Sequence, residues 1–209
     1  MMTQKLAHFF SILLHPLLMP TYGFMVLLYT NSYISFAIKN EGKILLISMI
    51  AMLTFALPSS LIFLLQKANY ITNIQLEKKE ERTLPFIIVA IFYIITFTTF
   101  RNYQLPKIFS IFILSGVVSL VLTSIINFFW KISAHMIGIG SLTSAFICIS
   151  ILLKVNLLIY IVCLVLLAGL LAASRLKLGV HNPSQVYVGY LTGFIAVLML
   201  FTIAIQIGH

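Results

Sequence analysis

The run IFSIFILSGVVSLVLTSIINFF, residues 108–129, carries no charged side chain and is flanked by Lys107 and Lys131. An α-helix needs about 20 apolar residues to cross the hydrocarbon core of a bilayer, and this run is long enough. It lacks the alternation of polar and apolar residues that is typical of strands in membrane β-barrels. Because a backbone in lipid must satisfy its own hydrogen bonds, the run predicts a transmembrane helix.

The rest of the chain repeats this pattern. Of its 209 residues, 61% are hydrophobic and only 8% are charged, which excludes an ordinary soluble domain. We predict an all-α, polytopic transmembrane helical bundle in which residues 1–209 form a single integral membrane domain. The third predicted span is short, so a re-entrant segment and a total of six spans are the alternative to seven. The predicted spans are Leu6–Tyr29, Ile44–Leu65, Pro85–Phe100, Ile108–Phe129, His135–Leu153, Val155–Ala173 and Pro183–Ile207.

Three local features qualify this description. His15-Pro16 and Pro20 fall inside the first predicted span, where proline predicts a kink. Cys148 and Cys163 lie in apolar runs without CxxC spacing, so we interpret them as packing residues. The first run has no small-residue cleavage site, so we expect a retained span rather than a signal peptide.

The charge balance is strongly basic, with 13 Lys and Arg against 4 acidic residues and a formal net charge of +9. The basic residues are scattered among predicted loops, so anionic lipid headgroups or phosphate groups fit better than nucleic acid. All four acidic residues are Glu, and no predicted span carries a carboxylate at mid-depth. This argues against a hydrolase dependent on Mg²⁺ or Zn²⁺, and against an ion-coupled transporter, so no cofactor is expected.

Counting predicted spans assigns the connections to two faces of the membrane. Three of them share one face because two spans separate each from the next: residues 66–84, 130–134 and 174–182. The others share the opposite face: the connections around 30–43, 101–107 and 154. The polar segments of the first face can therefore converge at one end of the bundle.

The first polar segment is Glu77-Lys78-Lys79-Glu80-Glu81-Arg82-Thr83-Leu84-Pro85, which by itself is typical of a solvated loop beside the membrane. The second is Trp130-Lys131-Ile132-Ser133-Ala134-His135. Ser133 is a predicted N-cap that places His135 in the first turn of a helix, where backbone amides and the helix dipole favour an anion. The alternative is an ordinary membrane-interface anchor.

The third polar segment begins at Ser174-Arg175 and reaches His181 and Asn182-Pro183-Ser184-Gln185. Arginine matches phosphate oxygens bidentately, and histidine serves as nucleophile or proton carrier near neutral pH. Asn182 is a predicted helix cap, with Pro183 at the first helical position and Gln185 three residues after the cap. His181 then lies just outside a helix N-terminus, where the dipole keeps the imidazole neutral and nucleophilic.

The third segment resembles a motif of the type 2 phosphatidic acid phosphatase superfamily, which comprises membrane lipid phosphatases related to vanadium haloperoxidases. That motif is Ser-Arg, five residues, His, three residues, Asp. Ser174, Arg175 and His181 match it in identity and spacing, and Gln185 stands at the Asp position.

The two other motifs of that family are less well kept. The second family motif is Pro-Ser-Gly-His, of which this chain keeps the Ser and the His as Ser133 and His135. The first family motif is a Lys, six residues and then Arg-Pro, of which this chain keeps the Arg as Arg82. Lys78 or Lys79 is the candidate for its lysine. The resemblance covers about residues 75–205 and leaves an additional N-terminal helical hairpin over residues 6–65.

The resemblance implies a membrane lipid phosphatase that hydrolyses a lipid phosphomonoester or diphosphate without a metal ion. His181 would attack phosphorus and form a phosphohistidine, and His135 would protonate the departing lipid oxygen. The implied partner is a membrane lipid, namely an anionic phospholipid or a polyprenyl phosphate. The implied phosphate-binding residues are Arg175, Arg82, Ser133, Lys79, Lys78 and Lys131.

Gln185 departs from the family pattern because its amide cannot stabilise a charged imidazole, although its carbonyl can still orient the ring. The alternative function is therefore a catalytically impaired lipid-binding or scaffold protein built on the same bundle.

The membrane face that carries the three polar segments has eight Lys and Arg, against five on the other face. Six of the eight lie in the proposed phosphate segments, so this count does not decide the orientation by the positive-inside rule. By resemblance, we expect a multi-pass protein of the cell membrane whose site faces the non-cytoplasmic side.

Overall fold

The computed structural model describes residues 2–73, 76, 78–103 and 105–207. In this part of the chain all regular structure is helical, and seven segments are long and apolar enough to cross a membrane. The predicted all-α polytopic bundle is therefore confirmed, with seven spans rather than six. The segments are Gln4–Tyr29, Asn40–Lys67, Lys79–Asn102, Lys107–Phe129, Ala134–Leu153, Leu158–Lys177 and Pro183–Gln206.

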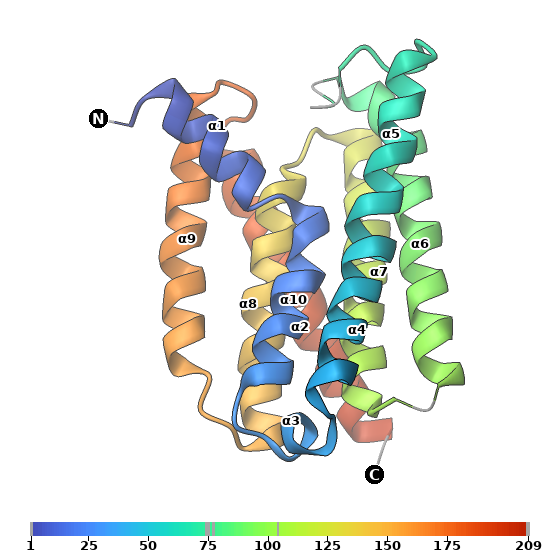
Figure 1. Ribbon diagram of the computed structural model, residues 1–209. Coiled ribbons are helices and arrows are strands. Elements are labelled where there is room, and N and C mark those ends of the chain that lie inside the picture. Colours follow the sequence, from blue (N-terminus) through green and yellow to red (C-terminus); the bar gives the residue numbers. More distant parts are fainter. Residues whose placement is uncertain (1, 74–75, 77, 104, 208–209) are drawn as a thin grey trace.

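The first membrane-spanning segment is broken rather than kinked. It consists of α1 (Gln4–Leu13), the 3₁₀ turn η1 (Pro16–Leu18) and α2 (Met19–Tyr29). His15 has an extended backbone because the following proline disfavours the helical conformation, and its Nδ1 accepts a hydrogen bond from the Leu17 amide at 3.3 Å. As a result α1 runs obliquely across the end of the bundle, and α2 descends along it (Figure 1).

The second segment contains a π-helical turn. After α3 (Tyr33–Ala37), helix α4 (Asn40–Ala51) passes through the turn η2 (Met52–Ala56) into α5 (Leu57–Lys67), whose second residue is Pro58. Proline lacks the amide that would continue the regular ladder, which accounts for the local rearrangement. The Thr54 hydroxyl in this turn lies 3.4 Å from the Leu17 carbonyl and so ties the segment to η1.

The third segment has full length. The 3₁₀ turn η3 (Lys79–Arg82) leads directly into α6 (Thr83–Asn102), so the helix begins before the apolar run predicted over Pro85–Phe100. Four long helices complete the bundle: α7 (Lys107–Phe129), α8 (Ala134–Leu153), α9 (Leu158–Lys177) and α10 (Pro183–Ile207).

Helices α8 and α10 pack closely against each other, and glycines allow this approach. A Cβ atom at Gly140 would collide with the Tyr190 carbonyl, and one at Gly193 would collide with the Ile137 carbonyl. Small residues at a helix interface let backbones approach closely, which is how helices in lipid gain van der Waals contact. The N-termini of α8 and α10 are thereby held side by side.

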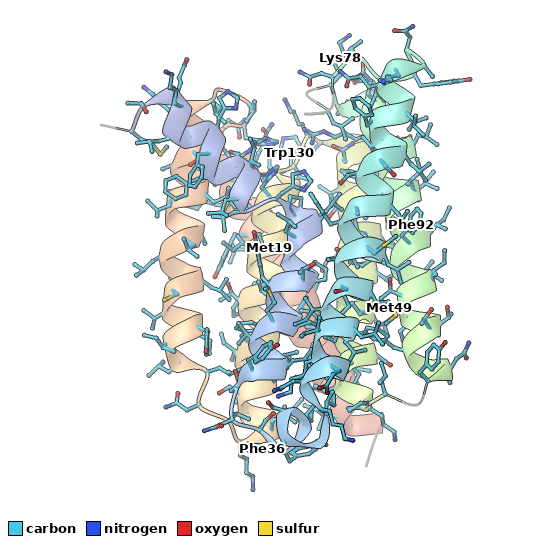
Figure 2. The ribbon with its side chains drawn as sticks, in the orientation of Figure 1. Met19, Phe36, Met49, Lys78, Phe92 and Trp130 are labelled. Carbon is cyan, nitrogen blue, oxygen red and sulfur yellow. The ribbon has the colours of Figure 1, made fainter. Side chains whose placement is uncertain are left out.

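The two ends of the bundle differ in what they carry. The N-terminus, the segment before α6 and the connections α7–α8 and α9–α10 lie at one end, whereas α3 and the C-terminus lie at the other (Figure 1). Figure 2 shows Lys78 and Trp130 at the first end and Phe36 at the opposite end. The span parity deduced from the sequence is thus observed, and all three polar segments share one end.

Candidate phosphate site

A cavity of about 660 Å³ opens among the helices at this end. Arg82, His135, Arg175 and His181 all line it, although they come from η3, α8, α9 and the connection that precedes α10. The structure therefore brings together two arginines and two histidines that lie up to about a hundred residues apart in the chain.

His181 is held by Gln185. Its Nδ1 lies 3.0 Å from Oε1 of Gln185, which also accepts the backbone amide of Asn182 at 3.3 Å. In return, the backbone N–H of Gln185 donates to Oδ1 of Asn182 at 2.9 Å, which completes the predicted cap of α10. Because Oε1 only accepts, Nδ1 of His181 must donate, and the lone pair of the ring is on Nε2.

The surroundings of His181 keep its ring neutral. Only 8% of the residue is exposed. Burial, together with the charges of Arg175, Arg82 and Lys131, lowers the pKa of His181 to about 4, although the hydrogen bond to Gln185 opposes this shift. At neutral pH the ring is therefore an unprotonated base, the form that a nucleophile requires.

Arg82 joins three parts of the site. Its Nε donates to the Leu76 carbonyl at 2.7 Å, and its Nη1 donates to Oδ1 of Asn127 at 3.2 Å and to the Ile132 carbonyl at 3.0 Å. Arg82 is 5% exposed, so these bonds fix the guanidinium in the wall of the cavity. They engage Nε and Nη1, and no other described residue forms a hydrogen bond with Nη2, so this nitrogen can bind a ligand.

Arg175 lies in the last turn of α9, where the helix dipole favours a cation, and is also buried. Its charge is close enough to act on both His135 and His181. His135, in the first turn of α8 as predicted, places its Nε2 3.1 Å from the carbonyl of Ser11 in α1.

Two predicted phosphate ligands, Lys78 and Lys79, lie outside the cavity lining. The Lys78 side chain is 63% exposed and pairs with Glu81 at 3.6 Å. Nζ of Lys79 lies 3.5 Å from the Phe128 carbonyl, so it interacts with the end of α7. A backbone carbonyl and a carboxylate near them interact with the two ammonium groups. Of the three cations in the first polar segment, Arg82 is therefore the one that lines the cavity.

Ser133 and Lys131 are also absent from the cavity lining. Ser133 occupies the N-cap position of α8, but its side chain makes no capping bond; it is fully buried, and its backbone amide lies 3.4 Å from the Gln185 carbonyl. The close approach of Gly189 on α10 confines it there. Lys131 remains near enough for its charge to act on His181.

The two described carboxylates of the first polar segment, Glu80 and Glu81, do not contact His181. Both oxygens of Glu81 interact with Thr72, and neither Glu80 nor Glu81 lines the cavity. Glu77 lies outside the described residues. Within the described ranges, no group of three or more His, Cys, Asp and Glu side chains has the geometry to hold a metal ion. The hydrogen-bond partner of the histidine is therefore the amide of Gln185.

The N-terminal segment contributes residues that the sequence did not assign to the site. Ser11 and His15 both line the cavity, and His15 packs against His135 with the ring centroids 5.3 Å apart. The break at His15-Pro16 was the available signal, because proline next to a buried histidine marks a backbone irregularity inside a span.

No protein-family model, no curated protein and no solved structure matches this chain.

Proposed function

We propose that this protein is a membrane lipid phosphatase that hydrolyses a lipid phosphomonoester or diphosphate through a phosphohistidine at residue 181. One observation carries the proposal. The side-chain carbonyl of Gln185 accepts Nδ1–H of His181, which leaves the lone pair of the ring on Nε2, and the same cavity is lined by two buried arginines and a second histidine. A neutral nucleophile beside fixed cations suits a tetrahedral phosphate dianion better than an uncharged ligand.

The reaction would proceed in two displacements. Nε2 of His181 attacks phosphorus and the bond to the lipid oxygen breaks. His135 takes up a second proton at Nδ1 when the phosphate dianion binds beside it, and donates that proton to the departing oxygen. Water then attacks the phosphohistidine, His135 takes the proton of the water, and the P–N bond breaks to release phosphate. Arg82 and Arg175 neutralise the non-bridging oxygens in both steps.

The shape of the cavity supports a lipid substrate. Thr123 and Phe112, 11 residues apart on α7, both line it, so it follows that helix for roughly 16 Å at about 1.5 Å per residue. Beyond the arginines and histidines its wall becomes largely apolar, with Val89, Ile113 and Leu142. A headgroup phosphate at the polar end would leave a hydrocarbon chain against the apolar wall.

Gln185 distinguishes this protein from a phosphatase with a carboxylate at that position. Its carbonyl orients His181 but supplies no negative charge to the imidazole as the ring attacks phosphorus. We propose a slower phosphatase on this basis. A lipid-binding scaffold on the same bundle is the competing function, because binding needs the arginines and not the charge on the histidine.

The test is phosphate release by detergent-purified protein from a panel of lipids that comprises phosphatidic acid, phosphatidylglycerol phosphate and a polyprenyl diphosphate. We expect release from at least one of them, unaffected by chelator and absent in His181→Ala. A short-chain, water-soluble phosphate ester should be a poorer substrate, because it leaves the apolar wall unfilled. Inhibition by chelator would contradict the proposed mechanism, and no release from any lipid would favour the scaffold.

A further inference from the structure

We propose that α1 and the turn after it complete the phosphate site, with Ser11 and His15 as positioning residues for Arg175 and His135. Their roles in turnover rest on the proposed function, whereas the geometry they impose on the histidine does not. The chain thus builds its site from the N-terminal segment as well as from the three polar segments that follow.

Ser11 contacts both functional partners through different atoms. Its carbonyl oxygen lies 3.1 Å from Nε2 of His135, and its Oγ lies 3.4 Å from Nη1 of Arg175. The residue is buried and lines the cavity. One residue of α1 therefore touches a group from α8 and a group from α9.

The carbonyl of Ser11 is available because the helix breaks. In a continued helix it would accept the amide of His15, but that amide donates to the Ile12 carbonyl at 3.2 Å instead. The last carbonyls of a helix need partners from outside, and His135 supplies one here. The His15-Pro16 break therefore creates the acceptor that holds His135.

This acceptor fixes the tautomer of His135. A carbonyl only accepts, so Nε2 must carry the proton, and Nδ1 is left to exchange a proton with the substrate. His181 has the opposite arrangement, with the proton on Nδ1 and the lone pair on Nε2. The two rings thus present complementary nitrogens, one for attack and the other for proton transfer.

His15 fixes the plane of the His135 ring. The two rings meet edge to face, with an interplanar angle of 82°. His15 is itself held, since its Nδ1 accepts the Leu17 amide. The charged and titratable groups that face His135 are Arg175, His15 and His181.

The segment is docked closely enough to position other groups. A Cβ atom added at Gly138 of α8 would lie 3.1 Å from Cβ of Pro16, so the glycine lets η1 approach the helix that carries His135. The contact of Thr54 with the Leu17 carbonyl holds η1 from the other side. Helix α1 crosses the end of α9 (Figure 1), where its Ser11 contacts Arg175.

Kinetic variants test the positioning roles on the lipid of the panel that is hydrolysed fastest. His15→Asn keeps a cap for η1, because Asn is a strong N-cap, but removes the ring beside His135. We expect kcat to fall about 10- to 100-fold, which is part of what general acid–base catalysis contributes, with KM nearly unchanged.

Ser11→Ala removes the hydroxyl that contacts Arg175 and should therefore raise KM, and Ser11→Thr should restore it. The exposed Lys5→Gln variant on the same helix is the control. Wild-type kcat in His15→Asn together with wild-type KM in Ser11→Ala would overturn the roles in turnover.

A second measurement does not depend on turnover. The chain has five histidines, so ¹⁵N-histidine NMR of the full-length protein in detergent resolves each ring, with His135→Gln assigning the relevant signal. We expect His135 as the Nε2–H tautomer, and loss of that single form in Gly138→Val, which displaces Pro16. Gly169→Val is the control, because nothing lies within 4 Å of a Cβ there. An Nδ1–H tautomer, or an unchanged His135 signal in Gly138→Val, would refute the positioning. The expected tautomer in a protein that releases no phosphate would refute only the proposed function.

Discussion

Oε1 of Gln185 accepts Nδ1–H of His181 at 3.0 Å and the backbone N–H of Asn182 at 3.3 Å. One amide oxygen thus caps α10 and selects the tautomer of the histidine that precedes it. Substitutions at this residue can separate orientation from charge, because Asp, Gln and Ala differ in which of the two they supply.

We predict that Gln185→Asp preserves or raises turnover, because a carboxylate both orients His181 and stabilises the imidazolium that forms during attack. Gln185→Ala should lose orientation as well, with a fall in kcat approaching the ~10⁴-fold effect of a wrong histidine tautomer in a serine protease triad. Phosphate release from lipid micelles measures both. Equal activity of the wild type and Gln185→Ala would show that Gln185 does not orient the nucleophile.

The same assay tests whether a glutamate of the first polar segment replaces the missing carboxylate. Because Thr72 holds Glu81 and neither Glu80 nor Glu81 lines the cavity, Glu80→Gln and Glu81→Gln should retain turnover within about twofold. A loss of tenfold or more in Glu80→Gln would mean that this carboxylate reaches His181 when substrate is bound.

The pH dependence should reveal the neutral state of His181. Burial lowers its pKa from 6.5 to about 4, so the ring is unprotonated above that pH and protonated below it. Since attack needs the unprotonated ring, protonation of His181 should lower kcat/KM only at pH values near 4. In Gln185→Asp the carboxylate raises the pKa of His181, and this acid limb should move to higher pH. A limb in the same place in both proteins would contradict the assignment.

Arg82 and Lys78 should differ sharply despite their common charge. Arg82→Ala leaves the acceptors at Leu76, Asn127 and Ile132 without their buried donor, at a cost of about 1–3 kcal/mol for each one left unsatisfied. We expect a lower thermal midpoint and loss of phosphate release. Lys78→Gln should change neither, because its side chain is 63% exposed and outside the cavity. A large kinetic defect in Lys78→Gln with unchanged stability would place that lysine in the site.

The membrane orientation is open to direct labelling. Thr83 and Asn102 lie at opposite ends of α6 and both are exposed. In a background without Cys148 and Cys163, an impermeant thiol reagent added to intact cells should label Thr83→Cys and spare Asn102→Cys. That pattern places the cavity on the non-cytoplasmic side, and labelling of Asn102→Cys alone would place it in the cytoplasm.

The sequence predicted the bundle well because its signals were local. Uncharged runs of sufficient length gave seven spans, and span parity placed Arg82, His135 and His181 at one end. The Asn182 and Gln185 cap also followed from its spacing. The third span was underestimated, since helical turns of polar residues from Lys79 precede the apolar run.

The details that the sequence did not reveal depend on tertiary packing. Ser133 has the sequence of a cap, but the approach of Gly189 buries its side chain without a capping bond. Lys78 and Lys79 have suitable charge, but local acceptors hold them outside the cavity. The contact between Ser11 and His135 uses a backbone carbonyl, which any residue could supply, so no sequence pattern marks it.

The most direct test of the central claim is mass spectrometry of purified protein quenched in base during turnover of its lipid substrate. A phosphohistidine is labile in acid and survives in base, so the peptide that contains His181 should carry one added phosphoryl group. The adduct should be absent in His181→Ala, which should also release no phosphate. Wild-type turnover in His181→Ala, or an adduct on a different residue, would contradict the account.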